Sequence, residues 1–286
     1  MLRCLAVAAI LVITTTVGLA QPAGIKHQDV GSPTLAGSYT VAAGKISIVG
    51  GGNDIWNTAD NFHFAYIPVT GDFDYVVRVE SLQGPDNWSK AELMAREGTD
   101  DGAGGLSFAG EDRHISNMTT RSGGQNEIGL QWRSDSSGSG SAWPNDIGIG
   151  TPLQRPTYPN TWLRLERTGS KFWAYASSDG IVWTLLRGSP YDFLALNGNE
   201  AALRTGGNMA NKLALGLALT AHNDGDASGA TAVFSEFKAF TPVPIAITTQ
   251  PPATLSVPAN SPLTLSIVAK GDPVHYQWRK DGVDIP

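Results

Sequence analysis

The feature that most constrains the fold is a period-two alternation of apolar and polar residues, which recurs from Val30 to Phe240 with no segment of clear helical periodicity. In segment 73–80, Phe, Tyr and Val occupy the odd positions, and charged residues occupy positions 74, 78 and 80. Such a segment forms a strand with one face in water. Segment 62–66 repeats the pattern one strand earlier.

Segments 162–167, 172–176 and 181–185 predict a three-stranded meander. Asp179 and Gly180 lie between the last two segments, and both residue types tolerate the positive φ of a tight hairpin turn. Further strands are predicted at 90–96, 105–109, 114–120, 127–133, 213–221 and 231–240. So many strands with short turns predict an all-β fold of two packed antiparallel sheets, an antiparallel β-sandwich spanning residues 28–240.

Composition narrows the classes of partner. Charged residues make up 16% of the chain, and 20 basic against 26 acidic residues give a net charge of −6. This balance argues against nucleic acid or an anionic membrane as the main partner. A single cysteine, Cys4, excludes a disulfide scaffold and a thiolate zinc site. The sequence carries no indication of oligomerisation.

Residues 1–20 have the pattern of a secretory signal peptide. Arg3 supplies the positive charge, 5–13 is an apolar run too short to span a bilayer, and Gly18 and Ala20 are the small residues before Gln21. The prediction is therefore an exported protein, secreted or held at the cell surface. No later segment approaches the length of a transmembrane helix, so no transmembrane anchor is predicted.

Prolines interrupt the strand pattern after Phe240. They occur at Pro242, Pro244, Pro251 and Pro252, so we place a linker at 241–246. Beyond the linker, the alternation resumes at 263–269.

Six motifs carry a resemblance of residues 28–240 to a known family. They are Asp54–Trp56, Asp60–Phe64, Gly71–Asp74, Trp88–Glu97, Ser178–Trp183 and Leu215–Asn223. In this order they resemble the concanavalin A-like (laminin-G/pentraxin-like) domain of secreted bacterial proteins, which implies a jelly-roll sandwich. One departure is Glu92, where relatives often have a small residue. The expectation is that Glu92 disturbs the packing of its strand or marks a local pairing.

Residues 247–286 resemble the first half of a bacterial immunoglobulin-like domain. The motifs are Ile247–Pro251, Leu263–Gly271 and Tyr276–Gly282. The resemblance implies that Trp278 is a core tryptophan and that a truncated Ig-like β-sandwich follows the first domain. Since the complete module has about 100 residues, we expect the chain to be a fragment of a longer polypeptide.

Motifs of catalysis are absent from the sequence, including G-x-S-x-G, H-E-x-x-H, a P-loop and an EF-hand loop. Concanavalin A-like glycosidases use carboxylates at alternate strand positions. Asp72 and Asp74 are the nearest such pair, and their place beside Gly71 favours a turn and a solvent-facing position. His63 and His114 are interpreted as structural. A non-catalytic module is therefore predicted. An accessory or degenerate glycoside hydrolase domain and a structural spacer without ligand are the alternatives.

Tryptophans near predicted strand ends or loops are candidate ligand contacts, since aromatic faces bind sugars in shallow sites. Trp56, Trp132 and Trp143 are predicted to bind glycan or an extracellular polymer, and core packing is the alternative for each; Trp88 has a similar position.

The loop 222–226 offers a possible calcium site at Asn223, Asp224 and Asp226. Ordinary turn chemistry is the favoured alternative there, because two carboxylates leave most of the oxygen shell of a calcium ion unfilled.

Overall fold

The computed structural model describes residues 21–121, 127–134, 141–142, 157–194 and 207–242 of the sandwich region. Beyond it, the structure describes 244, 246–254, 256–258, 261–262, 264–270, 279–280 and 283–284. These residues form strands, turns and loops, with no helix among them. The predicted signal peptide, Trp143 and Trp278 lie outside the described residues.

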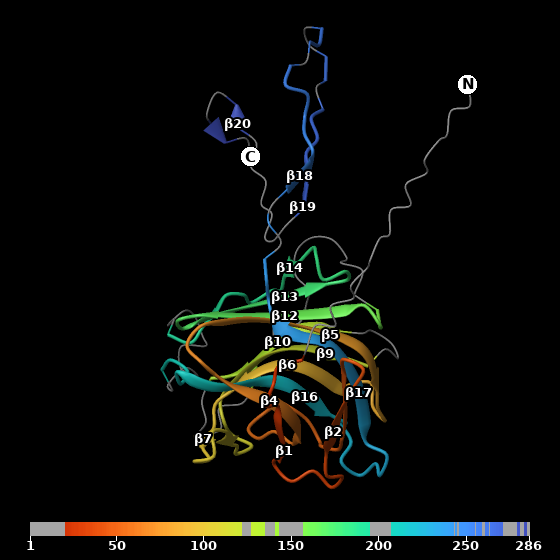
Figure 1. The fold of residues 1–286 in the computed structure, drawn as a ribbon, viewed down its shortest axis with the longest axis vertical. Coiled ribbons are helices and arrows are strands. Elements are labelled where there is room, and N and C mark those ends of the chain that lie inside the picture. The colour runs from red at the N-terminus through yellow and green to blue at the C-terminus, as the bar shows by residue number, and fades with distance from the viewer. Residues whose placement is uncertain are drawn as a thin grey trace, which may run out of the picture.

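Two antiparallel sheets lie face to face (Figure 1). The strand order of the seven-stranded sheet is β1 (Lys26–Val30), β4 (Phe62–Thr70), β16 (Lys212–Thr220), β6 (Lys90–Arg96), β9 (His114–Thr120), β10 (Ile128–Arg133) and β11 (Ser141–Ala142). β16 lies between β4 and β6, although it is far from both in the sequence. The sheet is therefore completed only when the end of the domain returns to its beginning.

The second sheet is eight-stranded. Its order is β14 (Thr184–Leu185), β13 (Lys171–Ser177), β12 (Thr161–Thr168), β5 (Phe73–Gln83), β17 (Ala230–Ala239), β3 (Lys45–Gly50) and β2 (Ser38–Ala42), and β15 (Tyr191–Asp192) pairs with β13. The two sheets confirm the predicted all-β fold class and the antiparallel β-sandwich.

The core lies between the sheets and follows the period-two pattern. Its larger side chains are Ile46, Ile48, Phe73, Val77, Val79, Leu93, Ile115, Leu130, Leu163, Leu165, Phe172, Phe193, Leu213, Leu215, Leu217, Leu219, Phe234 and Phe237. Trp132 belongs to this core, with 5% of its surface exposed and its ring centroid 4.3 Å from that of Tyr191. Its burial corrects the prediction that it contacts a ligand, because its strand turns the indole toward the other sheet.

Several strands differ from the sequence prediction. The structure adds three strands, β1, β2 and β3. β1 and β2 carry few buried residues, so alternation does not reveal them, whereas β3 alternates between buried and less buried residues and was missed. The segment predicted as a strand over 181–185 is shorter, since only β14 pairs there. The Asp179 carboxylate accepts hydrogen bonds from the backbone N–H groups of Ile181 and Val182, which extends the turn.

Smaller strand pairs lie outside the two sheets (Figure 1). They are β7 (Thr99–Asp100) with β8 (Leu106–Ser107), β18 (Ala246–Thr249) with β19 (Val268–Lys270), and β20 (Arg279–Lys280) with β21 (Val283–Asp284). Within the described part of the chain, no helix has the length and apolar character needed to cross a membrane.

Candidate functional site

The outer face of the seven-stranded sheet carries charged residues, yet loops cover it and exclude solvent. On β6, the side chains at positions 91, 93 and 95 belong to the core, so Lys90, Glu92, Met94 and Arg96 point the other way. All four are buried. They are buried because two connections of the chain, 51–61 and 97–113, fold over this face.

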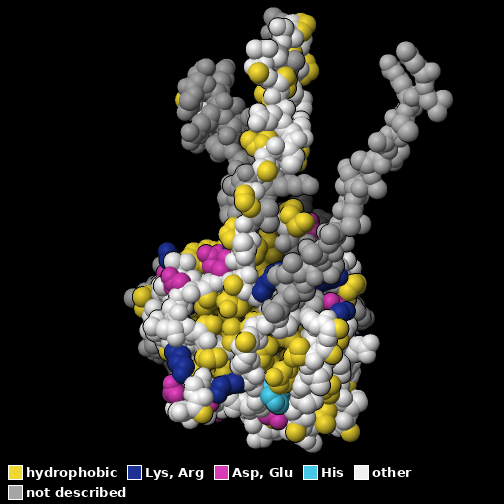
Figure 2. All heavy atoms as spheres, in the orientation of Figure 1, with side chains coloured by type: hydrophobic (Ala, Val, Ile, Leu, Met, Phe, Trp, Pro, Cys, Tyr) yellow, Lys and Arg dark blue, Asp and Glu magenta, His cyan; other side chains and the backbone are white. Residues whose placement is uncertain are grey.

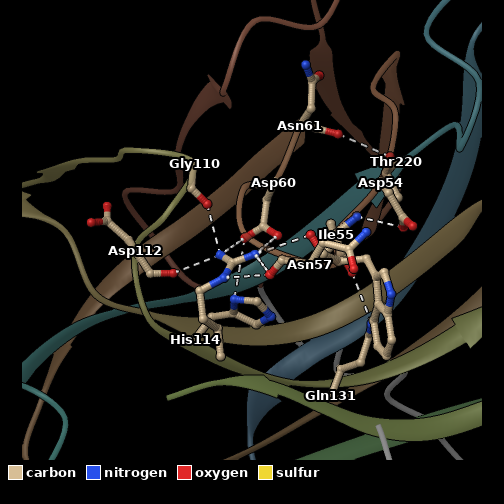
Figure 3. Close-up of polar contacts among 12 residues, drawn as sticks. Asp54, Ile55, Asn57, Asp60, Asn61, Gly110, Asp112, His114, Gln131 and Thr220 are labelled. Carbon is tan, nitrogen blue, oxygen red and sulfur yellow. Dashed lines mark hydrogen bonds and ion pairs between the residues drawn. The ribbon is translucent and has the colours of Figure 1, made fainter. Parts of the chain in front are cut away.

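An ion-pair network holds these connections to the sheet. Arg96 Nη1 lies 2.7 Å from Asp60 Oδ2, and Arg133 Nη2 lies 2.5 Å from Asp60 Oδ1. The three side chains are 0% exposed. Both arginines also donate to the backbone carbonyl of Gly110. Figure 3 shows Asp60, Gly110 and His114 gathered at this network, where His114 Nδ1 lies 3.4 Å from Asp60 Oδ2.

The charges of this network are set by burial and by its two arginines. Burial alone would raise the pKa of the Asp60 carboxyl, but the charges and hydrogen bonds of the two arginines outweigh it and hold that pKa below its ordinary value. Desolvation lowers the pKa of His114 well below the usual range, so its imidazole is neutral at pH 7. The network therefore combines one carboxylate with two guanidinium ions. It is structural, which agrees with the structural interpretation of His114.

Glu92 is the unusual member of this face. It is 0% exposed, and neither carboxylate oxygen has a hydrogen-bond partner. Its cross-strand neighbours are Ala218 on β16 and Met118 on β9, and Lys90 and Ser116 are the nearby polar groups that favour its ionised form. Burial raises the pKa of Glu92 to about 7, although Lys90 opposes the shift. Glu92 thus fits into its strand without disturbing the register, and its charge interacts with that of Lys90, two residues earlier on the same face of β6.

At one end of the same face, polar and aromatic side chains meet at a site that we call the rim site. It consists of Asp54, Trp56, Asp86, Trp88, Lys90 and His222. Lys90 Nζ lies 2.5 Å from Asp54 Oδ1 and 5.7 Å from the centroid of the Trp56 ring.

His222 bridges two carboxylates of the rim site. Its Nε2 lies 3.3 Å from Asp54 Oδ2, and its Nδ1 lies 3.2 Å from Asp86 Oδ1. Asp86 Oδ1 accepts a 2.7 Å hydrogen bond from the backbone N–H of Trp88, whose side chain is 40% exposed, whereas the contact of Asp86 with His222 is an ion-pair distance only. These contacts join the loops before β4, before β6 and after β16.

The two carboxylates influence the charge of His222. The hydrogen bond to Asp54 raises the pKa of His222, and this effect exceeds the opposing effect of partial burial. Burial would raise the pKa of Asp54, but His222 and Lys90 outweigh it and lower that pKa. The bridge is therefore strongest where His222 is protonated and Asp54 is ionised.

The predicted calcium ligands, Asn223, Asp224 and Asp226, accept hydrogen bonds from groups of their own loop and of neighbouring segments. Asp224 accepts hydrogen bonds from the backbone N–H groups of Thr34 and Gly52 and from the Thr34 hydroxyl. Asp226 accepts from Ser228, and Asn223 Oδ1 accepts from the N–H of Gly225. Among the described residues, no group of three or more His, Cys, Asp or Glu side chains could hold a metal ion. These contacts match the turn interpretation, and calcium binding stays a prediction.

The rim site contains one of the three predicted ligand contacts, Trp56, which is half-buried. Trp132 is in the core, and Trp143 lies outside the described residues. The prediction had left out Trp88 and had not connected Asp54, Asp86 and His222, which lie in three different loops. The motif Asp54–Trp56 and the loop at 222 were visible separately in the sequence, but their proximity depends on β16 lying between β4 and β6.

Asp72 and Asp74, the carboxylates considered for glycosidase chemistry, make contacts that hold neighbouring strands together. Asp72 Oδ1 accepts a 2.7 Å hydrogen bond from the N–H of Gly169, and Asp74 forms a two-contact ion pair with Arg164, at 2.8 and 2.7 Å. Both contacts join β5 to the neighbouring strand β12 or its turn.

The chain matches no protein-family model, and no curated protein matches it. Among solved structures, it is similar to a functionally unknown protein from Saccharomyces cerevisiae, with a TM-score of 0.50 and 18% identity over 77% of this chain and 97% of that one. LamAcat from Zobellia galactanivorans gives a TM-score of 0.38 and 12% identity, covering 68% of this chain and 76% of that one. The first similarity supports the β-sandwich fold and nothing finer.

Proposed function

We propose that this protein is a non-catalytic binding module that recognises glycan or another extracellular polymer at the rim site. The observation that carries the proposal is the pair Trp56 and Trp88, which flank the bridge of Asp54, His222 and Asp86. Aromatic faces pack against the C–H faces of sugar rings, and carboxylates and imidazole bond to hydroxyl groups. The rest of this sheet face is closed, so a ligand meets the rim rather than a long cleft.

The charge of the site favours a neutral or amino-sugar polymer over a polyanion. The chain has a net charge of −6, and the rim site presents two carboxylates whose cationic partners are already paired. A uronate or sulfated polymer would meet repulsion from these carboxylates.

The test is a glycan array of the full chain, followed by calorimetry of any neutral or amino-sugar ligand it identifies. Trp88→Ala should weaken binding about tenfold or more, because the exposed ring is lost. Trp173→Ala is the matched control, since this half-buried tryptophan of β13 lies on the other sheet. Absence of binding to any glycan, or an equal loss in both variants, would overturn the proposal.

The same proposal includes export and a multidomain context. The pattern of residues 1–20 supports a signal peptide, and the motifs of 28–240 and 247–286 support a concanavalin A-like sandwich followed by Ig-like sequence. N-terminal sequencing of the exported protein tests the first point, with Gln21 expected as the new first residue.

A second candidate function is an accessory or degenerate glycoside hydrolase domain. The observation that favours it is Glu92, a buried acid whose pKa is raised to about 7, as in a general acid, and this function requires connections 51–61 and 97–113 to open over it. Hydrolysis of a β-glucan by the wild type and its loss in Glu92→Gln would support this function over pure binding. Equal turnover, or none, in both proteins would exclude Glu92 as the acid.

A further inference from the structure

A second polar cluster lies at the edge of the seven-stranded sheet, where β1 pairs with β4. His63 Nδ1 lies 2.7 Å from Asp29 Oδ1, and His63 Nε2 lies 3.2 Å from His27 Nδ1. In the sheet register, Asp29 is directly opposite His63, and His27 is opposite Ala65, two residues further along β4. The three side chains therefore form a line with the buried His63 ring in the middle, between the partly exposed Asp29 carboxylate and the exposed His27.

The fold makes space for the His63 ring. A methyl group at Gly37 would lie 2.1 Å from Cγ and Nδ1 of His63, and one at Gly50 would lie 2.9 Å from its Cβ. The N–H of Gly37 also donates to both oxygens of Asp29, at 3.0 and 3.2 Å. Two glycines and one backbone N–H thus hold the imidazole and its carboxylate in place.

The His27 end of the line reaches solvent. His63 is 1% exposed, whereas His27 is exposed and its ring packs against Tyr39 at a centroid distance of 4.7 Å. Figure 2 shows histidine, in cyan, on the surface in the region of β1 and β2. A small ion can therefore reach the pair of rings from the side of His27.

The protonation of the pair follows from its contacts. Burial lowers the pKa of His63 despite the opposing effect of Asp29, so the ring is neutral near pH 7. Its Nδ1–H donates to the carboxylate, which leaves the lone pair of Nε2 directed at His27.

We propose that His27 and His63 form a surface site for a borderline divalent transition metal such as Zn²⁺, Ni²⁺ or Cu²⁺. With metal–nitrogen bonds of about 2.05 Å, a 3.2 Å separation of the nitrogens corresponds to an N–metal–N angle of about 100°, near the tetrahedral value. The metal takes the place of the hydrogen bond between the two rings, and neutral His27 then carries its proton on Nε2. Water fills the remaining positions.

The surroundings of His63 match those of a metal-binding histidine. Such a histidine donates its other N–H to a carboxylate, which fixes the tautomer and increases the basicity of the ligating nitrogen. Asp29 has this position. The two imidazoles favour Zn²⁺, Ni²⁺ and Cu²⁺ over Ca²⁺ and Mg²⁺, which prefer oxygen. This site is separate from the rim site and does not depend on the proposed glycan binding.

The test is calorimetry of the full, untagged chain with ZnCl₂ and NiCl₂, with CaCl₂ as the comparison, at pH 7.5. One Zn²⁺ or Ni²⁺ per chain is expected, with no binding of Ca²⁺ at this site. His27→Ala should abolish binding, and its exposed position makes the variant expected to fold. Asp29→Asn should weaken binding about 10- to 100-fold. Because both ligating nitrogens must be deprotonated, binding should weaken as the solution is made acidic.

His222→Ala separates this site from the histidine of the rim site and should keep wild-type metal affinity. Cu²⁺ electron paramagnetic resonance gives a second measurement, with two nitrogen ligands expected in the wild type and fewer in His27→Ala. Unchanged metal affinity in His27→Ala, or no binding of any of the three metals at millimolar concentration, would overturn the proposal.

Discussion

The ion pairs on the outer faces of the two sheets differ in their exposure to solvent. On the seven-stranded sheet, Asp60 is 0% exposed between Arg96 and Arg133, and loops cover the face. On the eight-stranded sheet, Arg164 pairs with Asp74, whose side chain is 26% exposed, and its guanidinium carbon lies 3.8 Å from the ring centroid of Phe240. The first face excludes water from its charges, whereas the second leaves its carboxylates partly hydrated.

This difference shows what each set of charges does for the fold. Removing one partner of a buried ion pair lowers the stability of the fold strongly, because the other charge is left unpaired away from water. Removing one partner of a hydrated pair lowers it little, because water replaces the partner. Four predictions use this contrast, beginning with the largest expected effect.

Asp60→Asn should lower the free energy of unfolding by about 3–5 kcal/mol, because two buried guanidinium ions lose their only carboxylate partner in the network. Urea denaturation of both proteins measures the change. Asp72→Asn is the matched control, since that carboxylate accepts one exposed backbone hydrogen bond and its loss should be small. Similar losses in the two variants would contradict the contrast between the faces.

Glu92→Gln should stabilise the protein at pH 8, with an effect that disappears at acid pH. The pKa of Glu92 is raised from 4.5 in the unfolded chain to about 7 in the fold, so the folded state holds one more proton between these values. Stability due to this group is complete below pH 4.5 and falls as the pH rises to 7, by about 3 kcal/mol at most.

Thermal unfolding of the wild type and Glu92→Gln from pH 4.5 to pH 8 measures this effect. The advantage of the variant should grow across this range and level off above pH 7. An advantage that is independent of pH would show that Glu92 does not titrate in the folded protein.

Arg164→Ala should cost about 2 kcal/mol, less than Asp60→Asn. The variant loses the ion pair with Asp74 and the packing of the guanidinium on Phe240 and Tyr175, but Asp74 is still reached by water. Urea denaturation at pH 7 provides the measurement, and Arg164→Lys shows how much depends on the planar group. A loss equal to that of Asp60→Asn would remove the difference between the faces.

Lys45→Ala should have the smallest effect, below about 1 kcal/mol, because the ion pair of Lys45 with Glu80 lies at the surface and is screened by salt. Urea denaturation at low salt and in 1 M NaCl provides the measurement. The high salt should remove most of the difference in unfolding free energy between the wild type and Lys45→Ala. A loss that persists in high salt would indicate packing of the lysine stem rather than charge.

Parts of the fold followed from local pattern alone. The strands β6 and β9 begin and end where the alternation predicted them, because one face of each packs against the core. β1 and β2 were missed, since they lie at the edges of their sheets and bury little. The candidate sites were predicted less well. Trp56 lies in the rim site and its ligand contact stays a prediction, Trp132 was assigned to the wrong environment, and the line of Asp29, His63 and His27 was not foreseen.

The sequence by itself determined the fold class, because a period of two and frequent turn residues leave an antiparallel sandwich as the way to bury the apolar faces. The partners of the polar residues were decided only by the tertiary structure. Period two states which residues share a face, but not which strands become neighbours. Placing β16 between β4 and β6, and β1 beside β4, brings His222 to Asp54 and His27 to His63. These contacts arise from strand order, which local alternation does not encode.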